Sequence, residues 1–313
     1  MSEQTLSRPA KRSAEGSLTA GKRLGLGRQL FLQFLCLLVA LTVLYPLLWI
    51  FSLSIDPRGI SRPKELMLIP PGATLTAYQA VIKQPTVNPV SFAQLTFNSL
   101  RLAGLTALAS VIIGVFAAYA YSRLKFAGRQ ALMLAVLTVL MIPSIAMLPA
   151  LFVLLNHVRV TIGSASFNLR DSLLGVGLAI LSGMLPFAIW NLKGYLDTIP
   201  RELEEAALID GCSPNSAFFR VVLPLSTPVL AVTFFLGFMS GWTEFAISWQ
   251  FLTNPKDFTL IMSLYNMVGQ YADATPWSRF AAMSILIALP VVVIYLSIQR
   301  YIAGGLSIGG VKG

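Results

Sequence analysis

Residue types that could do chemistry are scarce in this chain. Its single histidine, His157, lies beside Arg159 at the end of an apolar run, and no acidic or cysteine cluster accompanies it. A metal site needs several ligands together, so an interfacial role fits a lone histidine better. The two cysteines, Cys36 and Cys212, fall in an apolar run and in a polar loop, and they predict neither a disulfide framework nor a metal site.

Sequence motifs for catalysis and for nucleotide binding are also absent. No Gly-x-x-x-x-Gly-Lys-Ser/Thr loop occurs that would cradle ATP phosphates, and Lys312 in Gly-Gly-Val-Lys-Gly has a different spacing. A membrane enzyme would need catalytic groups clustered at one interface, and scattered acids with one histidine do not supply them. We therefore expect no catalytic residue, metal or cofactor in this chain, and an energy source in another chain.

Five of the thirteen acidic residues lie in one polar stretch, residues 197–224. Residues 201–210 are good helix formers that follow Pro200, and proline is tolerated in a first helical turn. Gly211 then provides a C-terminal stop that accepts a positive φ, and Ser213-Pro214 is typical of the start of a second helix. Three glutamates lie toward the positive end of the first helix dipole: Glu202, Glu204 and Glu205. The stretch predicts a helix, a glycine turn and a second short helix.

Composition identifies the chain as an integral membrane protein. Of its 313 residues, 56% are hydrophobic and 12% are charged, with a mean hydropathy of +0.73. Soluble domains carry about 25% charged residues. The net charge of +10 would suit a nucleic-acid partner, but the basic residues cluster beside apolar runs with little aromatic interleaving. Membrane topology explains them better, so we expect a lipid bilayer and no nucleic acid as the surroundings.

Windows without a charged residue predict six transmembrane helices, because about 20 residues cross about 30 Å of hydrocarbon. The windows are 29–55, 102–122, 130–156, 172–192, 221–243 and 280–299. A shorter run, 258–272, fits a re-entrant or interfacial helix, and residues 75–83 fit a short helix in an outer loop. Pro224 and Pro228 predict a break or kink near the start of the fifth span. A ridge of small residues favours close helix packing in the second span: Thr106, Ser110, Gly114 and Ala118.

The positive residues predict how these helices are oriented. With the N-terminus inside, more of the 23 lysines and arginines fall on the cytoplasmic side than on the outer side. Both termini are therefore expected in the cytoplasm, together with the polar stretch. The chain divides into a flexible cytoplasmic tail (1–28), a six-span domain (29–303) with a loop at 193–224, and a C-terminal cytoplasmic tail (304–313).

Part of the polar stretch resembles a known loop. Glu205-Ala206-Ala207, with Gly211 four residues on and Leu223-Pro224 beyond it, resembles the EAA loop in permease subunits of ATP-binding-cassette (ABC) importers. In that family the loop is a cytoplasmic coupling helix that docks in a groove of the ATPase subunit. An ordinary amphipathic helix between two spans is the alternative. The resemblance implies these coupling residues: Glu205, Ala206, Ala207, Asp210, Gly211, Leu223 and Pro224.

Two further segments extend the resemblance, which covers the chain from about Phe31 to its last residue. Residues 117–128 resemble the cytoplasmic turn that follows the second span in the same family. The glycine-rich end is similar to that of the second permease subunit in maltose-type importers. By this resemblance the end contacts the ATPase through Gly309, Gly310, Val311, Lys312 and Gly313.

The resemblance implies an all-α integral membrane protein with six transmembrane helices and the type I permease fold of ABC importers. It implies a heterodimer with a second permease subunit, two ATPase subunits that bind the ATP, and an external sugar-binding protein, in a bacterial inner membrane. Maltose and maltodextrins are the expected substrates, and trehalose or other oligosaccharides would use the same scaffold. The alternative is a secondary transporter of a small polar solute. It would show two duplicated halves and several membrane-embedded acids, and neither is evident in this sequence.

Glu244 is the one acid within a long apolar run, and it lies between Trp242 and Trp249. An ionisable residue inside a membrane is a functional candidate by default. Two interpretations stand: a side chain that faces the translocation pathway and accepts hydrogen bonds from sugar hydroxyls, or an acid at the outer headgroup level within an aromatic belt. Asn266 and Gln270 are the next candidates for the pathway.

Overall fold

The computed structural model describes residues 25–59, 67–162, 165–269 and 275–309, and it divides into two units, residues 1–48 and 49–313. The first unit holds most of helix α1 (Leu26–Ser54), an apolar helix of 29 residues with Pro46 inside it. Its length and composition allow it to cross a membrane. The helix begins just before the predicted start of the first span, at residue 29.

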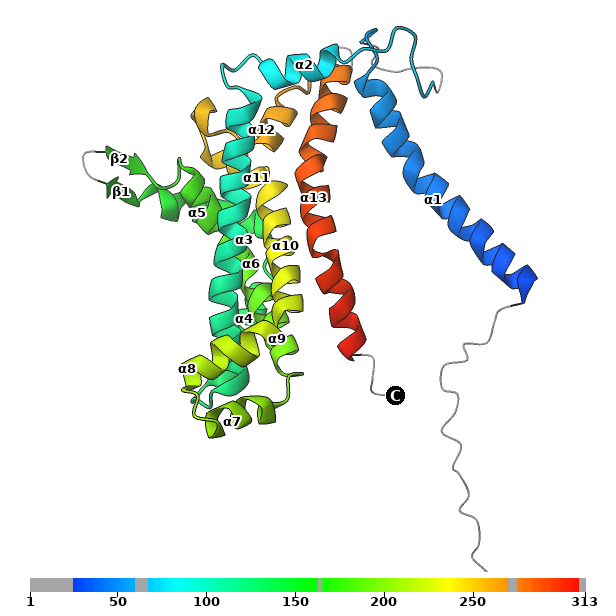
Figure 1. Cartoon of the computed structure of the whole chain (residues 1–313). Helices are drawn as coiled ribbons and strands as arrows, with labels where there is room; N and C mark the ends of the chain where they lie inside the picture. The colour runs from blue at the N-terminus through cyan, green and yellow to red at the C-terminus, as the bar shows by residue number, and fades with distance from the viewer. Residues whose placement is uncertain (1–24, 60–66, 163–164, 270–274, 310–313) are drawn as a thin grey trace, which may run out of the picture. The chain divides into compact units, whose positions relative to one another are not determined.

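The second unit is built on helices that pack side by side. α3 (Phe92–Arg123) lies against both α6 (Leu173–Leu196) and α10 (Thr227–Trp242), and α13 (Trp277–Gly309) packs on α10 (Figure 1). α3, α6 and α13 each contain an apolar stretch long enough to span a membrane. The predicted all-α class is confirmed.

Small residues let these helices approach closely. The ridge predicted in the second span, Thr106 to Ala118, lies on α3 and is buried at all four positions. On the facing helix, a Cβ added to Gly237 would lie 2.8 Å from the Cα of Ala107. A Cβ added to Gly241 would lie 2.7 Å from the Cα of Ala103. Backbone therefore meets backbone along this seam, as the small-residue pattern predicts.

Two of the predicted spans are bent pairs of helices. α4 (Arg129–Val139) and α5 (Ser144–Asn156) meet at 99°, and Pro143 lies directly before α5. A residue before proline avoids the helical region, which is why a helix ends ahead of it. Within the described residues, four helices are long enough to span a membrane, and the number rises to six if each bent pair is one span.

The second bent pair lies at the start of α10. α8 (Pro214–Ala217), a π-helical turn (Phe218–Val222) and α9 (Leu223–Leu225) precede it, and the two arms meet at 74°. Proline lacks an N–H and clashes with the preceding turn, so Pro224 and Pro228 account for the break that the sequence predicts here.

Short elements complete the unit. The predicted short helix is α2 (Thr76–Lys83), and the described part of the run predicted as interfacial contains α12 (Leu260–Tyr265). α11 (Ala246–Phe251) and a 3-10 turn (Pro255–Asp257) lie between α10 and α12. A hairpin that was not predicted follows α5: β1 (Arg159–Ile162) pairs antiparallel with β2 (Ala165–Asn168) and projects to the side (Figure 1).

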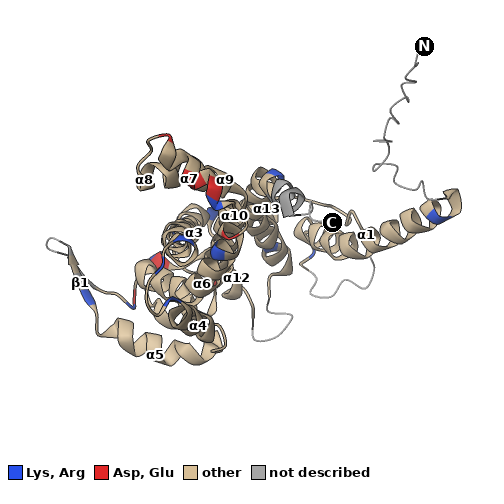
Figure 2. Ribbon diagram, turned by 90° about the horizontal axis from the view of Figure 1, so that it is seen from below, with Lys and Arg blue, Asp and Glu red and all other residues tan. Residues whose placement is uncertain are grey.

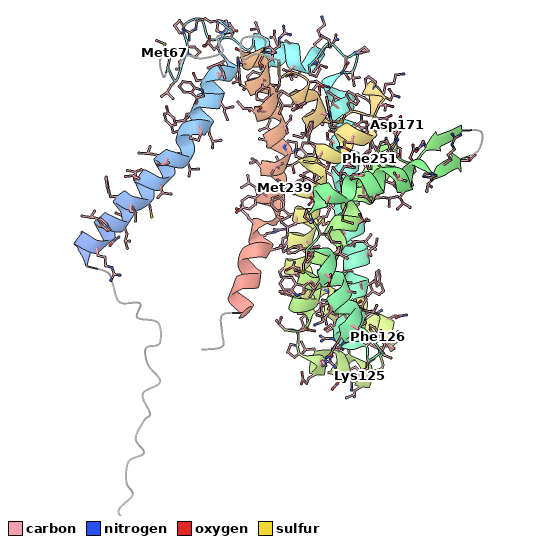
Figure 3. The ribbon with its side chains drawn as sticks, turned by 180° about the vertical axis from the view of Figure 1, so that it is seen from behind. Met67, Lys125, Phe126, Asp171, Met239 and Phe251 are labelled. Carbon is pink, nitrogen blue, oxygen red and sulfur yellow. The ribbon has the colours of Figure 1, made fainter. Side chains whose placement is uncertain are left out.

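The two ends of the second unit differ, and we name them after the helices that lie there. The α7 end holds α7 (Arg201–Ile209), α8, α9 and the last turn of α3. Lys125 and Phe126, directly after α3, mark this end in Figure 3. The α2 end holds α2, α12 and the first turn of α3 (Figure 1). Buried apolar residues fill the α7 end behind α7, among them Leu192, Phe218 and Val222.

Candidate functional site

Helix α7 begins and ends almost where the sequence predicts. Gly211 has a φ of +89°, and its N–H donates to the carbonyl of Leu208 at 3.1 Å. The N–H of Cys212 donates to the carbonyl of Ala207 at 2.9 Å. These two bonds form a Schellman motif, which requires a left-handed residue at the position of the glycine. The predicted glycine stop is confirmed.

The starts of α7 and α8 are built differently. Pro200 is the N-cap of α7, one position ahead of the first-turn place predicted for it, and it provides no side-chain cap. Ser213 caps α8 as predicted, because its side chain accepts a hydrogen bond from the N–H of Ser216 at 3.2 Å, with Pro214 in the first turn. α8 therefore has a local cap, whereas the contacts that hold α7 come from another helix.

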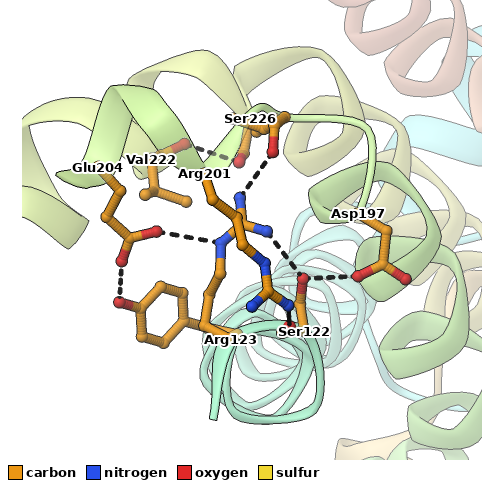
Figure 4. A network of polar contacts seen from close by, with 9 residues as sticks. Ser122, Arg123, Asp197, Arg201, Glu204, Val222 and Ser226 are labelled. Carbon is orange, nitrogen blue, oxygen red and sulfur yellow. Dashed lines mark hydrogen bonds and ion pairs between the residues drawn. The ribbon is translucent and has the colours of Figure 1, made fainter. Parts of the chain in front are cut away.

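Those contacts come from the last turns of α3 (Figure 4). Nε of Arg123 donates to Oε2 of Glu204 at 3.0 Å, and Nη2 of the same side chain donates to the carbonyl of Ile199 at 2.9 Å. The hydroxyl of Tyr119 donates to Oε1 of Glu204. Both carboxylate oxygens of Glu204 are thus occupied by donors from α3.

The connection between α6 and α7 is held in the same way. Oγ of Ser122 donates to Oδ1 of Asp197 at 2.6 Å, and Nη2 of Arg201 donates to the carbonyl of Ser122 at 2.8 Å. Burial alone would raise the pKa of Asp197. Hydrogen bonds from Lys193 and Ser122, together with the positive charges of Lys193 and Arg123, instead lower this pKa below the ordinary value of 3.8. This carboxylate is therefore ionised at neutral pH.

The Arg123–Glu204 ion pair is largely enclosed. The two side chains expose 7% and 14% of their surface, respectively. The ring of Phe218 packs edge-on against Tyr119, which donates to Glu204, and the two ring centroids lie 4.7 Å apart. An enclosed charge without its partner is strongly unfavourable, so each of the two side chains depends on the other.

The opposite side of α7 is open. Glu205, Ala206 and Asp210 are exposed, and so are the apolar side chains of Leu208 and Ile209, the latter at 86%. Figure 2 looks at this end of the bundle and shows acidic residues gathered around α7. The helix therefore presents an acidic and apolar face on which nothing in the described part of the chain packs.

The structure brings most of the predicted coupling residues together. Residues 205–211 lie on α7 and its glycine turn, and Ala207 among them is half-buried. Leu223 and Pro224 lie on α9, where Leu223 packs on the apolar cluster around Phe218 and Pro224 is exposed. Four of the predicted residues therefore lie on the exposed side of α7 and its turn: Glu205, Ala206, Asp210 and Gly211. Ala207 is turned toward the bundle, and Leu223 lies behind it.

Sequence reasoning missed the two residues that fix α7 in place. In the sequence, Glu204 stands out only for its position near the helix start, and Arg123 is one of several basic residues that favour the cytoplasmic side. They are 81 positions apart, so no local pattern pairs them. The available signal is that Glu204 and Glu205 are adjacent, and adjacent side chains on a helix point in different directions.

Glu244 has a structural partner that the sequence does not indicate. Its Oε1 accepts a hydrogen bond from the N–H of Ile247 at 2.6 Å, and its Oε2 accepts one from the N–H of Ser248 at 2.9 Å and another from the Ser248 hydroxyl. The carboxylate thus satisfies the free N–H groups at the start of α11. It also lines a cavity of about 650 Å³ between α5, α6, α10 and α11, together with Ser182 and Thr243.

The remaining candidates lie elsewhere. Asn266 is exposed at the C-terminus of α12 and does not line the cavity that Glu244 lines. Gln270 and residues 310–313 lie outside the described residues, and Gly309 is the last residue of α13. Across the described ranges, no three or more His, Cys, Asp or Glu side chains are grouped as a metal site would require.

Comparisons with known proteins place this geometry in context. The permease protein GanQ of the galactooligosaccharide transport system of Bacillus subtilis (strain 168) is 34% identical over 91% of this chain and 96% of its own length. The trehalose permease protein SugB of Mycobacterium tuberculosis is 33% identical over 93% and 100%, respectively. The maltose/maltodextrin permease protein MalG of Escherichia coli (strain K12) is 32% identical over 91% and 96%.

Solved structures and a family signature agree with these relatives. A chain of a bacterial ABC transporter for import of the acidic polysaccharide alginate superimposes with a TM-score of 0.71, at 22% identity, over 89% of this chain and 98% of that one. Residues 110–307 match the family described as binding-protein-dependent transport system inner membrane component. That description denotes a transport component and not an enzyme. The chain therefore belongs to the family of binding-protein-dependent transport system inner membrane components.

Proposed function

We propose that this chain is a permease subunit of an ATP-driven oligosaccharide importer, and that α7 is the helix by which it docks on a separate ATPase subunit. The observation that carries the proposal is the division of α7 into two sides. Glu204 and Ala207 face the bundle, whereas Glu205, Ala206 and Ile209 are exposed. Exposed apolar side chains that follow an acidic first turn, on a helix held rigidly from behind, are suited to a protein groove.

The open face of α7 has the chemistry that such a groove would recognise. Ala206 lets another backbone approach closely, because its side chain is a single methyl group. Leu208 and Ile209 offer apolar surface to bury, at about 25 cal/mol per Å². Glu205 offers a charge-assisted hydrogen bond to a basic group of the partner.

Docking on an ATPase requires the α7 end to lie in the cytoplasm. The excess of lysine and arginine on this side supports that orientation. Both termini then lie in the cytoplasm, and the α2 end faces outward, where an external sugar-binding protein would deliver the substrate. A second permease subunit and two ATPase subunits complete the proposed assembly, with the C-terminal residues 309–313 reaching the ATPases.

For the substrate we propose a maltose/maltodextrin-type oligosaccharide. Relatives of similar identity are named for maltose and maltodextrin, galactooligosaccharides and trehalose. All of these sugars are rich in hydroxyl groups, and the cavity beside Glu244 carries hydroxyls at Ser144, Ser182 and Thr243. We propose that Glu244 faces this pathway. Carboxylate lone pairs that are not bonded to α11 would accept hydrogen bonds from the sugar hydroxyls.

The test uses the reconstituted complex of this chain with its partner permease, ATPase and binding protein. Wild-type complex should import labelled maltotriose at the cost of ATP, and unlabelled galactooligosaccharide or trehalose should compete weakly. Glu205→Lys should insert in the membrane and abolish uptake, because the reversed charge repels the basic partner. Gly211→Val should do the same through strain at positive φ. Gly59→Val is the matched control, since Gly59 has a φ of +64° and equally open surroundings at the other end.

Three outcomes would count against the proposal. Wild-type uptake by Glu205→Lys and Gly211→Val would refute the docking role of α7. Equal loss of uptake in Gly59→Val would show that strain alone is responsible. Efficient import of trehalose or galactooligosaccharide in preference to maltotriose would overturn the substrate but leave the importer intact.

A further inference from the structure

Two arginine side chains, one from α3 and one from α7, join these helices where they meet. Arg123, the last residue of α3, reaches Glu204 and the carbonyl of Ile199 beside α7. Arg201, the first residue of α7, reaches back to the carbonyl of Ser122 on α3 at 2.8 Å. Each helix therefore supplies a guanidinium to the other, as Figure 4 shows.

The bonds made by Arg123 differ in kind from an ordinary surface ion pair. Its guanidinium donates in three directions: to the Glu204 carboxylate, to the Ile199 carbonyl and, at 3.3 Å, to Oγ of Ser122. A planar guanidinium holds its donors at fixed angles, so several simultaneous bonds fix orientation as well as distance. The Lys193–Asp197 ion pair differs from this arrangement. It lies within a single turn and is more exposed, and its lysine does not connect α6 to another helix.

The polypeptide chain connects α7 to one helix, whereas the side-chain hydrogen bonds of α7 connect it to another. Along the chain, α7 is connected to α6 by the short segment 197–200. The side-chain bonds of α7 instead run to α3, and α3 packs on both α6 and α10. A displacement of α7 can therefore reach α3 directly, and through it the centre of the bundle.

We propose that Arg123 is a positioning residue that locks α7 to the end of α3, so that the two helices move as one body when the ATPase displaces α7. The proposal rests on the function proposed above for α7. It also separates the tasks of two neighbouring acids: Glu204 faces inward and transmits the displacement, whereas Glu205 faces outward and receives it.

The direct test is a distance measurement in the assembled complex. Spin labels at Lys125 and Glu202, both exposed, report on the end of α3 and on α7 after Cys36 and Cys212 are replaced by serine. We expect a narrow distance distribution that is the same without nucleotide and with ATP. In Arg123→Gln the distribution should broaden and differ between the two states.

The functional readout is the number of sugar molecules imported per ATP hydrolysed, for folded complex only. We expect Arg123→Gln and Glu204→Gln to lower this ratio about tenfold, within the usual range of coupling energies. Lys193→Gln is the matched control, and its ratio should equal that of the wild type. A purely structural role for Arg123 would reduce the yield of complex and leave the ratio unchanged.

Two results would overturn the proposal. One is a wild-type distance between the labels that changes with ATP while transport is intact. The other is a wild-type transport ratio in folded Arg123→Gln complex. Failure of the proposed function itself looks different, because the ATPase would then not co-purify with the wild-type chain at all.

Discussion

The two ends of the helical unit use polar side chains in different ways. At the α7 end, ionised side chains from separate helices bind each other, with Arg123 on Glu204 at the centre. At the α2 end, side chains bind the backbone of a loop. Nδ2 of Asn98 donates to the carbonyls of Lys256 and Phe258 at 2.7 and 2.9 Å, and Oγ of Ser99 accepts from the N–H of Leu260 at 2.8 Å.

The other side of the same loop is held by the start of α6. Oδ1 of Asp171 accepts a hydrogen bond from the N–H of Thr253 at 2.8 Å, and Nη1 of Arg170 donates to the carbonyl of Phe251 at 3.0 Å. The loop is therefore held largely through its backbone, and the hydroxyl of Thr253 donates to Asp171 as well. In the Arg123–Glu204 pair at the α7 end both partners are side chains, so both residue types are required.

The largest expected effect comes from a substitution in the seam between α3 and α10, which runs between the two ends. Gly237→Leu would place side-chain atoms where the backbone of Ala107 lies, and overpacking of this kind costs about 1–3 kcal/mol or more. We expect little folded protein, measured as the monodisperse fraction after extraction in detergent. Gly104→Leu on α3 is the control, since a Cβ there meets nothing within 4 Å. Similar yields for the two variants would contradict the seam.

The next prediction tests whether the loop at the α2 end is held through its backbone. Asn98→Leu would leave two loop carbonyls without their donor, at about 1–3 kcal/mol for an enclosed unsatisfied group. We expect faster hydrogen exchange of amides in residues 252–260. Lys256→Ala should leave exchange unchanged, because only the backbone of Lys256 is bonded. Faster exchange in Lys256→Ala would show that the loop depends on its side chains after all.

Much of the α7 end could be predicted because its signals are local. Gly211 and Ser213 act within one turn of their own positions, and both behave as the sequence indicates. The pairing of Arg123 with Glu204 joins distant segments and leaves no periodic trace. Pro143 indicates a kink at residues 140–143, but the 99° size of the bend was not predictable, because an apolar window reads the same whether the helix bends slightly or folds back.

Glu244 shows where a correct signal supports more than one structure. The acid inside an apolar run was recognised, but its role at the start of α11 depends on a six-residue helix without a capping residue of its own at Phe245. Glu244→Leu should lower sugar uptake more than Glu244→Gln, because a lost helix-terminal acceptor costs about 1 kcal/mol. Uptake by the reconstituted complex measures this, with basal ATP hydrolysis as control. Equal wild-type rates for both variants would remove Glu244 from the pathway.

The smallest expected effect is a pH dependence at the α7 end. The folded pKa of Asp197 is below its ordinary value of 3.8, so its stabilising contribution is present above that value and is lost as pH falls through the lower folded pKa. The difference in melting temperature between wild type and Asp197→Asn should therefore be constant from about pH 7 to pH 5 and close only below about pH 4. A difference that closes near pH 6 would contradict the lowered pKa.

The central claim is that the open face of α7 meets an ATPase, and photo-cross-linking in intact membranes tests it most directly. A photoreactive amino acid is placed at Ile209, exposed on α7, or at Val87, which is 97% exposed between α2 and α3. We predict an adduct with the ATPase subunit from Ile209 and none from Val87. No ATPase adduct from Ile209, or an ATPase adduct from Val87, would contradict the account.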